Sequence, residues 1–166
     1  MLLLPLIAMQ FTDEVDWTGS DFVFAAVLLF GSLGLFELAV RKSGDAAYRA
    51  GAGVALAAVF LLVWVNGAVG LTDSAADVLF FLLVPAVAIV GALLARFQPR
   101  GMARAMFATA LVLTSVAVAA LVAGIVPAYN STFEILGIAG FFAALFVGSG
   151  LLFREAAREK PERGAV

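Results

Sequence analysis

Residues 105–126 read AMFATALVLTSVAVAALVAGIV and include no charged side chain. A helix rises about 1.5 Å per residue, so about 20 apolar residues are needed to cross the hydrocarbon core of a bilayer. This stretch meets that length. A helix that is apolar on every face is either buried in a large core or spans a membrane. The stretch therefore predicts a membrane-spanning helix.

Further stretches of similar length and composition occur at residues 22–40, 50–69, 78–95 and 133–153. The chain is 64% hydrophobic and 13% charged, whereas about one quarter of the residues in a soluble domain are charged. The links between the stretches are short, which is typical of antiparallel neighbours in a bundle. We therefore expect an all-α fold, a polytopic transmembrane helix bundle of five spans in a single domain, followed by a tail at residues 154–166.

Prolines interrupt the apolar pattern in two places. Pro85 lies inside the third stretch, where it removes a backbone hydrogen bond and predicts a kink. The kink can serve as a hinge or simply as a packing feature. Residues 99–101 read Pro-Arg-Gly and predict a turn between the third and fourth spans.

Basic residues are confined to three segments. All ten Lys and Arg residues fall within residues 41–49, 96–104 and 154–163. With five spans, these segments lie on one side of the membrane, whereas four or six spans would divide them between both sides. The positive-inside rule then places them in the cytoplasm and the N-terminus outside.

The first ten residues, MLLLPLIAMQ, are apolar but too short to span a bilayer. They lack the basic start and the small-residue cleavage site of a secretory signal peptide. We expect them either to lie in the outer interface or to precede a true start at Met9.

Three residues are candidates for function within or near the spans. Glu37 is the candidate for an ionisable group inside the lipid, and its spacing of four from Arg41 favours a pair on one helix face. It forms either an interfacial ion pair or part of a proton pathway. Asn66 can cross-link helices or contact a ligand. Trp64 suits an aromatic belt at the outer interface.

Two further patterns suggest binding or packing. Asp73, Asp77 and Glu134 belong to an outer face without basic residues, and carboxylates of this kind could hold Ca²⁺ or Mg²⁺. Helix capping and the positive-inside bias explain the same residues, so no metal site is assigned. Gly140, Ala144 and Gly148 recur every four residues, which allows close helix approach either within the bundle or between copies.

The residue types that are missing limit the chemistry. The chain contains no Cys and no His, which excludes disulfides, thiolate nucleophiles and imidazole-ligated metal or haem sites. No Lys lies in a span to form a Schiff base, and no phosphate-binding glycine loop is present. We therefore expect no enzyme activity, no cofactor and no nucleic-acid partner.

Three segments resemble a set of small, uncharacterised bacterial multi-span membrane proteins: FTDEVDWT at 11–18, FLLVWVNGAVG at 60–70 and RGMARAMFAT at 100–109. The resemblance covers about residues 9–155 and implies a bacterial inner membrane location, with no known activity, cofactor or catalytic residue. The leading prediction is a non-catalytic accessory or structural protein that packs in the lipid bilayer with itself or with a larger membrane complex. The alternatives are a minor transporter or ion-conducting oligomer, and an outward-facing binder of cations or lipids.

Overall fold

Every regular element in the described part of the computed structural model is helical; that part comprises residues 3–12, 17–69, 82–124 and 132–159. The elements are α1 (Leu3–Ala8), α2 (Gly19–Lys42), α3 (Ala46–Val69), α5 (Val84–Leu94), α6 (Pro99–Val122) and α7 (Thr132–Glu159). The predicted all-α fold is therefore confirmed. Among the described residues, α2, α3, α6 and α7 are long and apolar enough to cross a membrane. The chain is thus a multi-span membrane protein.

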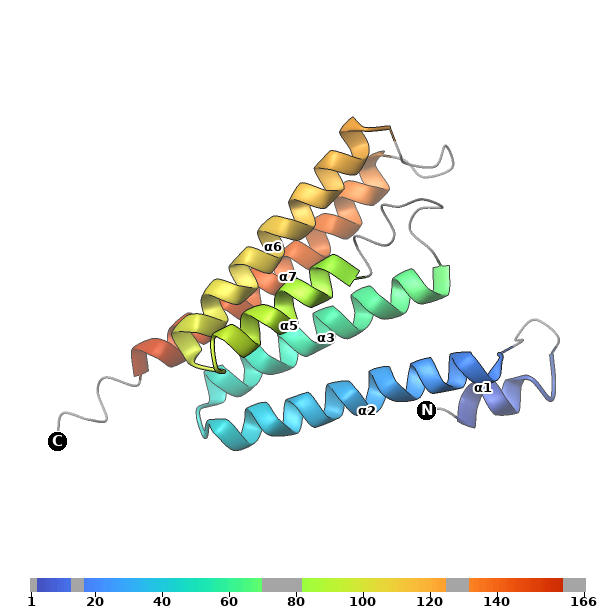
Figure 1. Ribbon diagram of the computed structural model, residues 1–166, viewed down its shortest axis with the longest axis horizontal. Coiled ribbons are helices and arrows are strands. Elements are labelled where there is room, and N and C mark those ends of the chain that lie inside the picture. The colour runs from blue at the N-terminus through green and yellow to red at the C-terminus, as the bar shows by residue number, and fades with distance from the viewer. Residues whose placement is uncertain (1–2, 13–16, 70–81, 125–131, 160–166) are drawn as a thin grey trace.

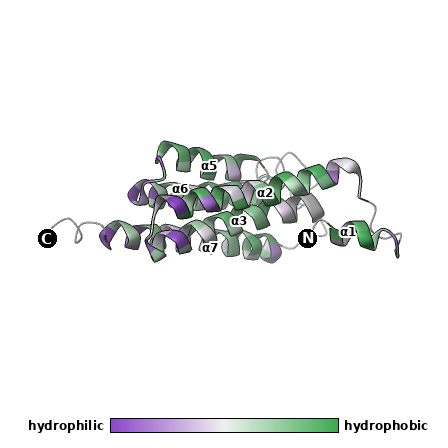
Figure 2. Ribbon diagram, turned by 90° about the horizontal axis from the view of Figure 1, so that it is seen from below, coloured by the Kyte–Doolittle hydropathy of each residue, from purple (hydrophilic) through white to green (hydrophobic). Residues whose placement is uncertain are grey.

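From α2 onward, consecutive helices run in opposite directions (Figure 1). α2 runs toward the end of the bundle at which α7 finishes, α3 runs back, α5 returns, α6 runs back again and α7 returns. Most of the deep purple, hydrophilic positions lie near helix ends, with long green stretches between them (Figure 2). This is the up-and-down arrangement that the short links predict.

The predicted third span is described only in part. Residues 70–81 lie outside the described residues, and α5 begins at Val84. Pro85 occupies the first turn of α5, and Leu82 and Leu83, which precede this helix, adopt π-helical geometry. A proline in a first turn removes no intrahelical hydrogen bond, and a wide turn before it provides room for its ring. Pro85 therefore lies at the start of α5, and the kink predicted within the third span stays a prediction, because residues 70–81 lie outside the described residues.

The prediction of a turn at residues 99–101 is wrong, because these residues begin α6. Pro99 lies in the first turn of α6, where its fixed φ suits a helix start. The chain reverses instead at Arg96 and Phe97, whose φ values of 49° and 57° are left-handed. Such angles cost about 1–3 kcal/mol for each non-glycine residue. The Tyr48 hydroxyl of α3 donates a 2.8 Å hydrogen bond to the Phe97 carbonyl and helps to hold this turn.

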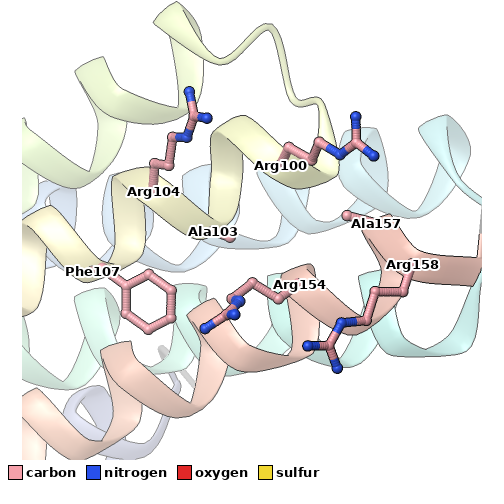
Figure 3. Close-up of a pocket in the computed structure, with 7 residues that line it drawn as sticks. All are labelled: Arg100, Ala103, Arg104, Phe107, Arg154, Ala157 and Arg158. Carbon is pink, nitrogen blue, oxygen red and sulfur yellow. The ribbon is translucent and has the colours of Figure 1, made fainter.

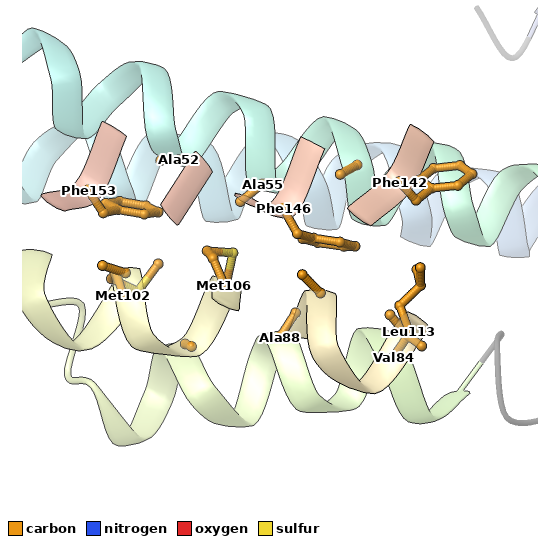
Figure 4. Packing of buried hydrophobic residues seen from close by; sticks show 14 of the residues in the cluster. Ala52, Ala55, Val84, Ala88, Met102, Met106, Leu113, Phe142, Phe146 and Phe153 are labelled. Carbon is orange, nitrogen blue, oxygen red and sulfur yellow. The ribbon is translucent and has the colours of Figure 1, made fainter. Parts of the chain in front are cut away.

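The core is built around α7, which packs extensively against both α6 and α3. Phe142, Phe146 and Phe153 project from α7 into the space between these helices (Figure 4). Opposite them lie small residues of α3 and the methionines of α6, including Ala52, Ala55, Met102 and Met106. Large rings on one helix therefore fill the space that small residues leave on its neighbours.

At Gly91, α5 approaches α6 closely. A Cβ atom added to Gly91 would lie 2.7 Å from the Cβ of Ala105 and 3.4 Å from its Cα. Helices gain little from apolar burial when lipid is the alternative, so such close van der Waals contact is what holds them together. The pair of small residues therefore lets the two backbones meet.

A buried serine joins α7 to α3. The Ser149 hydroxyl donates a 2.8 Å hydrogen bond to the carbonyl of Gly51, and the Ser149 side chain is fully buried. Ser149→Ala is expected to lower the free energy of unfolding in detergent by about 0.6–1.7 kcal/mol, the range for hydrogen bonds between membrane helices. Ser115→Ala, at an exposed position of α6, is the matched control. Equal stability of the two variants would contradict this contact.

Candidate functional site

The aromatic residues near the start of α2 and the far end of α3 form a cluster. The Trp64 ring stacks on Phe60 with 5.9 Å between centroids and lies 6.1 Å from the ring of Trp17. Trp17 also makes an edge contact with Phe22. This end of the bundle is opposite to the end that carries the described arginines. Asn66 lies in α3, but its side chain is outside the described residues.

Glu37 forms the pair that its spacing predicts. The Arg41 Nε donates a 2.9 Å hydrogen bond to Glu37 Oε1, and both side chains are more than half exposed. The pair lies in the last two turns of α2. An exposed ion pair of this kind contributes about 0.3–0.5 kcal/mol to a helix. The geometry therefore matches an ion pair at the helix end.

The acidic candidates are not brought together by the described structure. Glu134 lies exposed in the first turn of α7, where a carboxylate interacts favourably with the helix dipole. Asp73 and Asp77 lie outside the described residues. Within the described ranges, no group of three or more Asp, Glu, His or Cys residues is placed to hold a metal ion.

The small residues Gly140, Ala144 and Gly148 lie on a side of α7 that faces away from the other described helices. A Cβ atom added to Gly140 or Gly148 would meet no described atom within 4 Å. Ala144 is exposed as well. This pattern predicts close packing either within the bundle or between copies. The described contacts do not support packing within the bundle. Close approaches occur at other glycines instead, among them Gly91 against Ala105 and Gly150 against Phe107.

An apolar groove runs along α2, and no pattern in the sequence predicts it. It encloses about 250 Å³ between α2, α3, α5 and the first turns of α6. The α2 wall extends from Val27 to Ala39, a length of about 18 Å at 1.5 Å per residue. On the other walls, alanines of α3 and α5 leave the space open: Ala52, Ala55, Ala88 and Ala92.

The groove exists because α2 is attached to the rest of the molecule mainly through α3. In α2, 11% of the apolar stretch is buried, against 39% in α3 and in α6. Gly31 and Ser32 lie on the groove side of α2. The Ser32 hydroxyl donates to the Leu28 carbonyl at 2.6 Å, so this hydroxyl is satisfied without a water molecule. The groove is thus an apolar surface suited to apolar side chains.

The chain matches no protein-family model, no curated protein and no solved structure. The resemblance to small bacterial membrane proteins therefore stays a prediction.

Proposed function

We propose that this protein is a small non-catalytic accessory component of a membrane assembly, and that the groove along α2 receives an apolar transmembrane helix of another chain. The observation that carries the proposal is the low burial of α2 beside an open apolar groove. Helices associate in lipid where small residues allow close van der Waals contact. Gly31 and the alanines that line the groove provide such a surface.

The proposal includes a topology of five spans in a bacterial inner membrane, with the N-terminus outside and the C-terminus in the cytoplasm. The alternating helix directions support it, because α3 ends at one end of the bundle and α6 begins at the other. The segment between them must return across the same distance. The described arginines lie at the end where α2, α5 and α7 finish, and Trp17 and Trp64 lie at the opposite end. Basic residues favour the cytoplasmic side, and aromatic rings favour membrane interfaces.

Filling the groove tests the function. Gly31→Leu places a side chain in the groove at a position where an added Cβ meets nothing within 4 Å, so the fold should be preserved. Loss of groove packing costs about 1–3 kcal/mol, which corresponds to roughly a tenfold loss of the associated form. The measurement is the yield of stoichiometric partner, or of homo-oligomer, after purification from native membranes in mild detergent.

Gly34→Leu is the matched control, because Gly34 has equal open space but does not line the groove. We expect Gly34→Leu to keep the association that Gly31→Leu loses. A partner protein in the complex identifies a larger assembly, and a second copy identifies self-association. A monomer without a partner, or equal association in both variants, would contradict the proposal.

A further inference from the structure

Four arginines line one pocket at the basic end of the bundle. Arg100 and Arg104 come from the first turns of α6, and Arg154 and Arg158 come from the last turns of α7 (Figure 3). The pocket encloses about 500 Å³. It lies on a different side of α6 from the α2 groove, which Met102 and Met106 line. The inference drawn from it is therefore independent of the proposed lateral association.

The positive charge of this pocket is poorly compensated. Arg158 pairs with Glu155 at 3.4 Å, but both side chains are more than half exposed, so the pair contributes little. Arg100, Arg104 and Arg154 form no ion pair with any residue in the described ranges. The N-terminus of α6 adds its partial positive charge at the same place. Like charges gathered in one cavity attract an anion strongly.

The floor of the pocket is apolar. Phe107 lies there together with Ala103 of α6 and Ala157 of α7. The Phe107 ring reaches across to the backbone of α7 at Gly150, where an added Cβ would lie 2.9 Å from the ring. The absence of a side chain at Gly150 thus lets the ring close the cavity on its membrane side. An anion bound here would lie among guanidinium groups from α6 and α7 and beside the Phe107 ring, which lies next to Arg154 (Figure 3).

The spacing of the arginines along the two helices matches the thickness of a phospholipid headgroup region. Arg100 and Arg104 are one turn apart on α6, as are Arg154 and Arg158 on α7, so each pair spans about 6 Å along its helix. The headgroup region on each side of a bilayer is about 5–7 Å thick. Arg side chains also extend along apolar surface while their charged groups reach polar surroundings. In a bundle whose basic end lies in the headgroup region, these charges would therefore reach the level of the lipid phosphates.

We propose that this pocket binds the phosphate group of an anionic phospholipid in the leaflet at the basic end of the bundle. Guanidinium groups bind phosphate oxygens through paired N–H donors, a geometry that a lysine cannot reproduce. The chemistry is that of any phosphate-bearing anion. The apolar residues Phe107, Ala103 and Ala157 in the lining favour a lipid over a free phosphate, because acyl chains can continue along the apolar helices beside the ring. Basic pockets between membrane helices recognise headgroups in this way.

Native mass spectrometry of the full chain in detergent tests the proposal by titration with phosphatidylglycerol or phosphatidylethanolamine. We expect saturable retention of phosphatidylglycerol over phosphatidylethanolamine. In the double variant Arg104→Gln with Arg154→Gln, this retention should fall about tenfold, as expected when charge-assisted hydrogen bonds to an anion are lost. The matched control is Arg41→Gln with Arg49→Gln, which removes two charges at the same end of the bundle but outside the pocket.

The control variant distinguishes binding in the pocket from general electrostatic attraction of the lipid to the basic end of the bundle. Retention that is unchanged in the control and lost in the pocket variant supports the proposal. Equal loss in both double variants, or equal retention of the two lipids by the natural chain, would overturn it. Competition with inorganic phosphate is the third measurement. If millimolar phosphate displaces phosphatidylglycerol completely, the pocket recognises a soluble anion and the lipid assignment is wrong.

Discussion

Phe146→Ala is expected to lower the free energy of unfolding by about 3 kcal/mol, near the lower end of the range for Phe to Ala changes in protein cores. Phe146 has no exposed surface, and its ring lies between α3 and α6 (Figure 4). In lipid the transfer part of the cost is small, because acyl chains are as apolar as the core. The cost of the cavity remains, because its walls lose their van der Waals contacts with the ring. The measurement is reversible unfolding in mixed detergent micelles.

Phe133→Ala is the control for this change, because Phe133 lies in the first turn of α7 and is 87% exposed. We expect it to leave the stability within about 0.5 kcal/mol of the natural chain. Equal destabilisation by both variants would show that α7 does not present Phe146 to the core. An unchanged stability of Phe146→Ala would contradict the described packing of α3, α6 and α7.

The second large effect is expected at Gly91. In Gly91→Leu, the first added carbon already lies 2.7 Å from the Cβ of Ala105, and that atom is fixed to the backbone of α6 and cannot rotate away. The helices must therefore separate. Overpacking usually lowers the free energy of unfolding by about 1–3 kcal/mol. Because two helices must separate here, we expect Gly91→Leu to lower it by about 3 kcal/mol or more. The expected result is a strong loss of folded protein after extraction, measured by size-exclusion chromatography and unfolding.

Gly140→Leu is the matched control for Gly91→Leu. Both glycines precede a small residue by four positions, Ala95 after Gly91 and Ala144 after Gly140, and both changes add the same atoms to a helix. An added Cβ at Gly140 meets no described atom within 4 Å, so the fold should tolerate this change. A larger loss of folded protein in Gly140→Leu than in Gly91→Leu would contradict the described contact between α5 and α6.

The existence of the helices follows from the sequence, because apolar stretches of spanning length with at most one charged residue have few alternatives. The stretches at residues 22–40, 50–69, 105–126 and 133–153 all lie within or largely within observed helices. Their ends were predicted less well. α6 begins at Pro99, about a turn and a half before the predicted start, because a proline fits the first turn of a helix and charged side chains continue a helix beyond the lipid.

The choice of packing faces could not be predicted. In a membrane helix the core-facing and lipid-facing residues are both apolar, so periodicity does not distinguish them. The sequence therefore gives Gly91 and Gly140 the same pattern, although one meets Ala105 and the other faces open space. The groove along α2 depends on how few neighbours that helix has, and the arginine pocket depends on the contact of α6 with α7. Both are properties of the tertiary arrangement.

The membrane topology underlies both proposals, and cysteine labelling measures it directly because the chain contains no cysteine. Gly19→Cys and Thr132→Cys mark the proposed outer end, and Gly44→Cys and Gln98→Cys mark the basic end. In sealed right-side-out vesicles, a membrane-impermeant maleimide is expected to label the two outer positions, and to label the two basic-end positions only after permeabilisation. Labelling of Gly44→Cys or Gln98→Cys in sealed vesicles, with Thr132→Cys protected, would contradict a five-span bundle with its arginines in the cytoplasm.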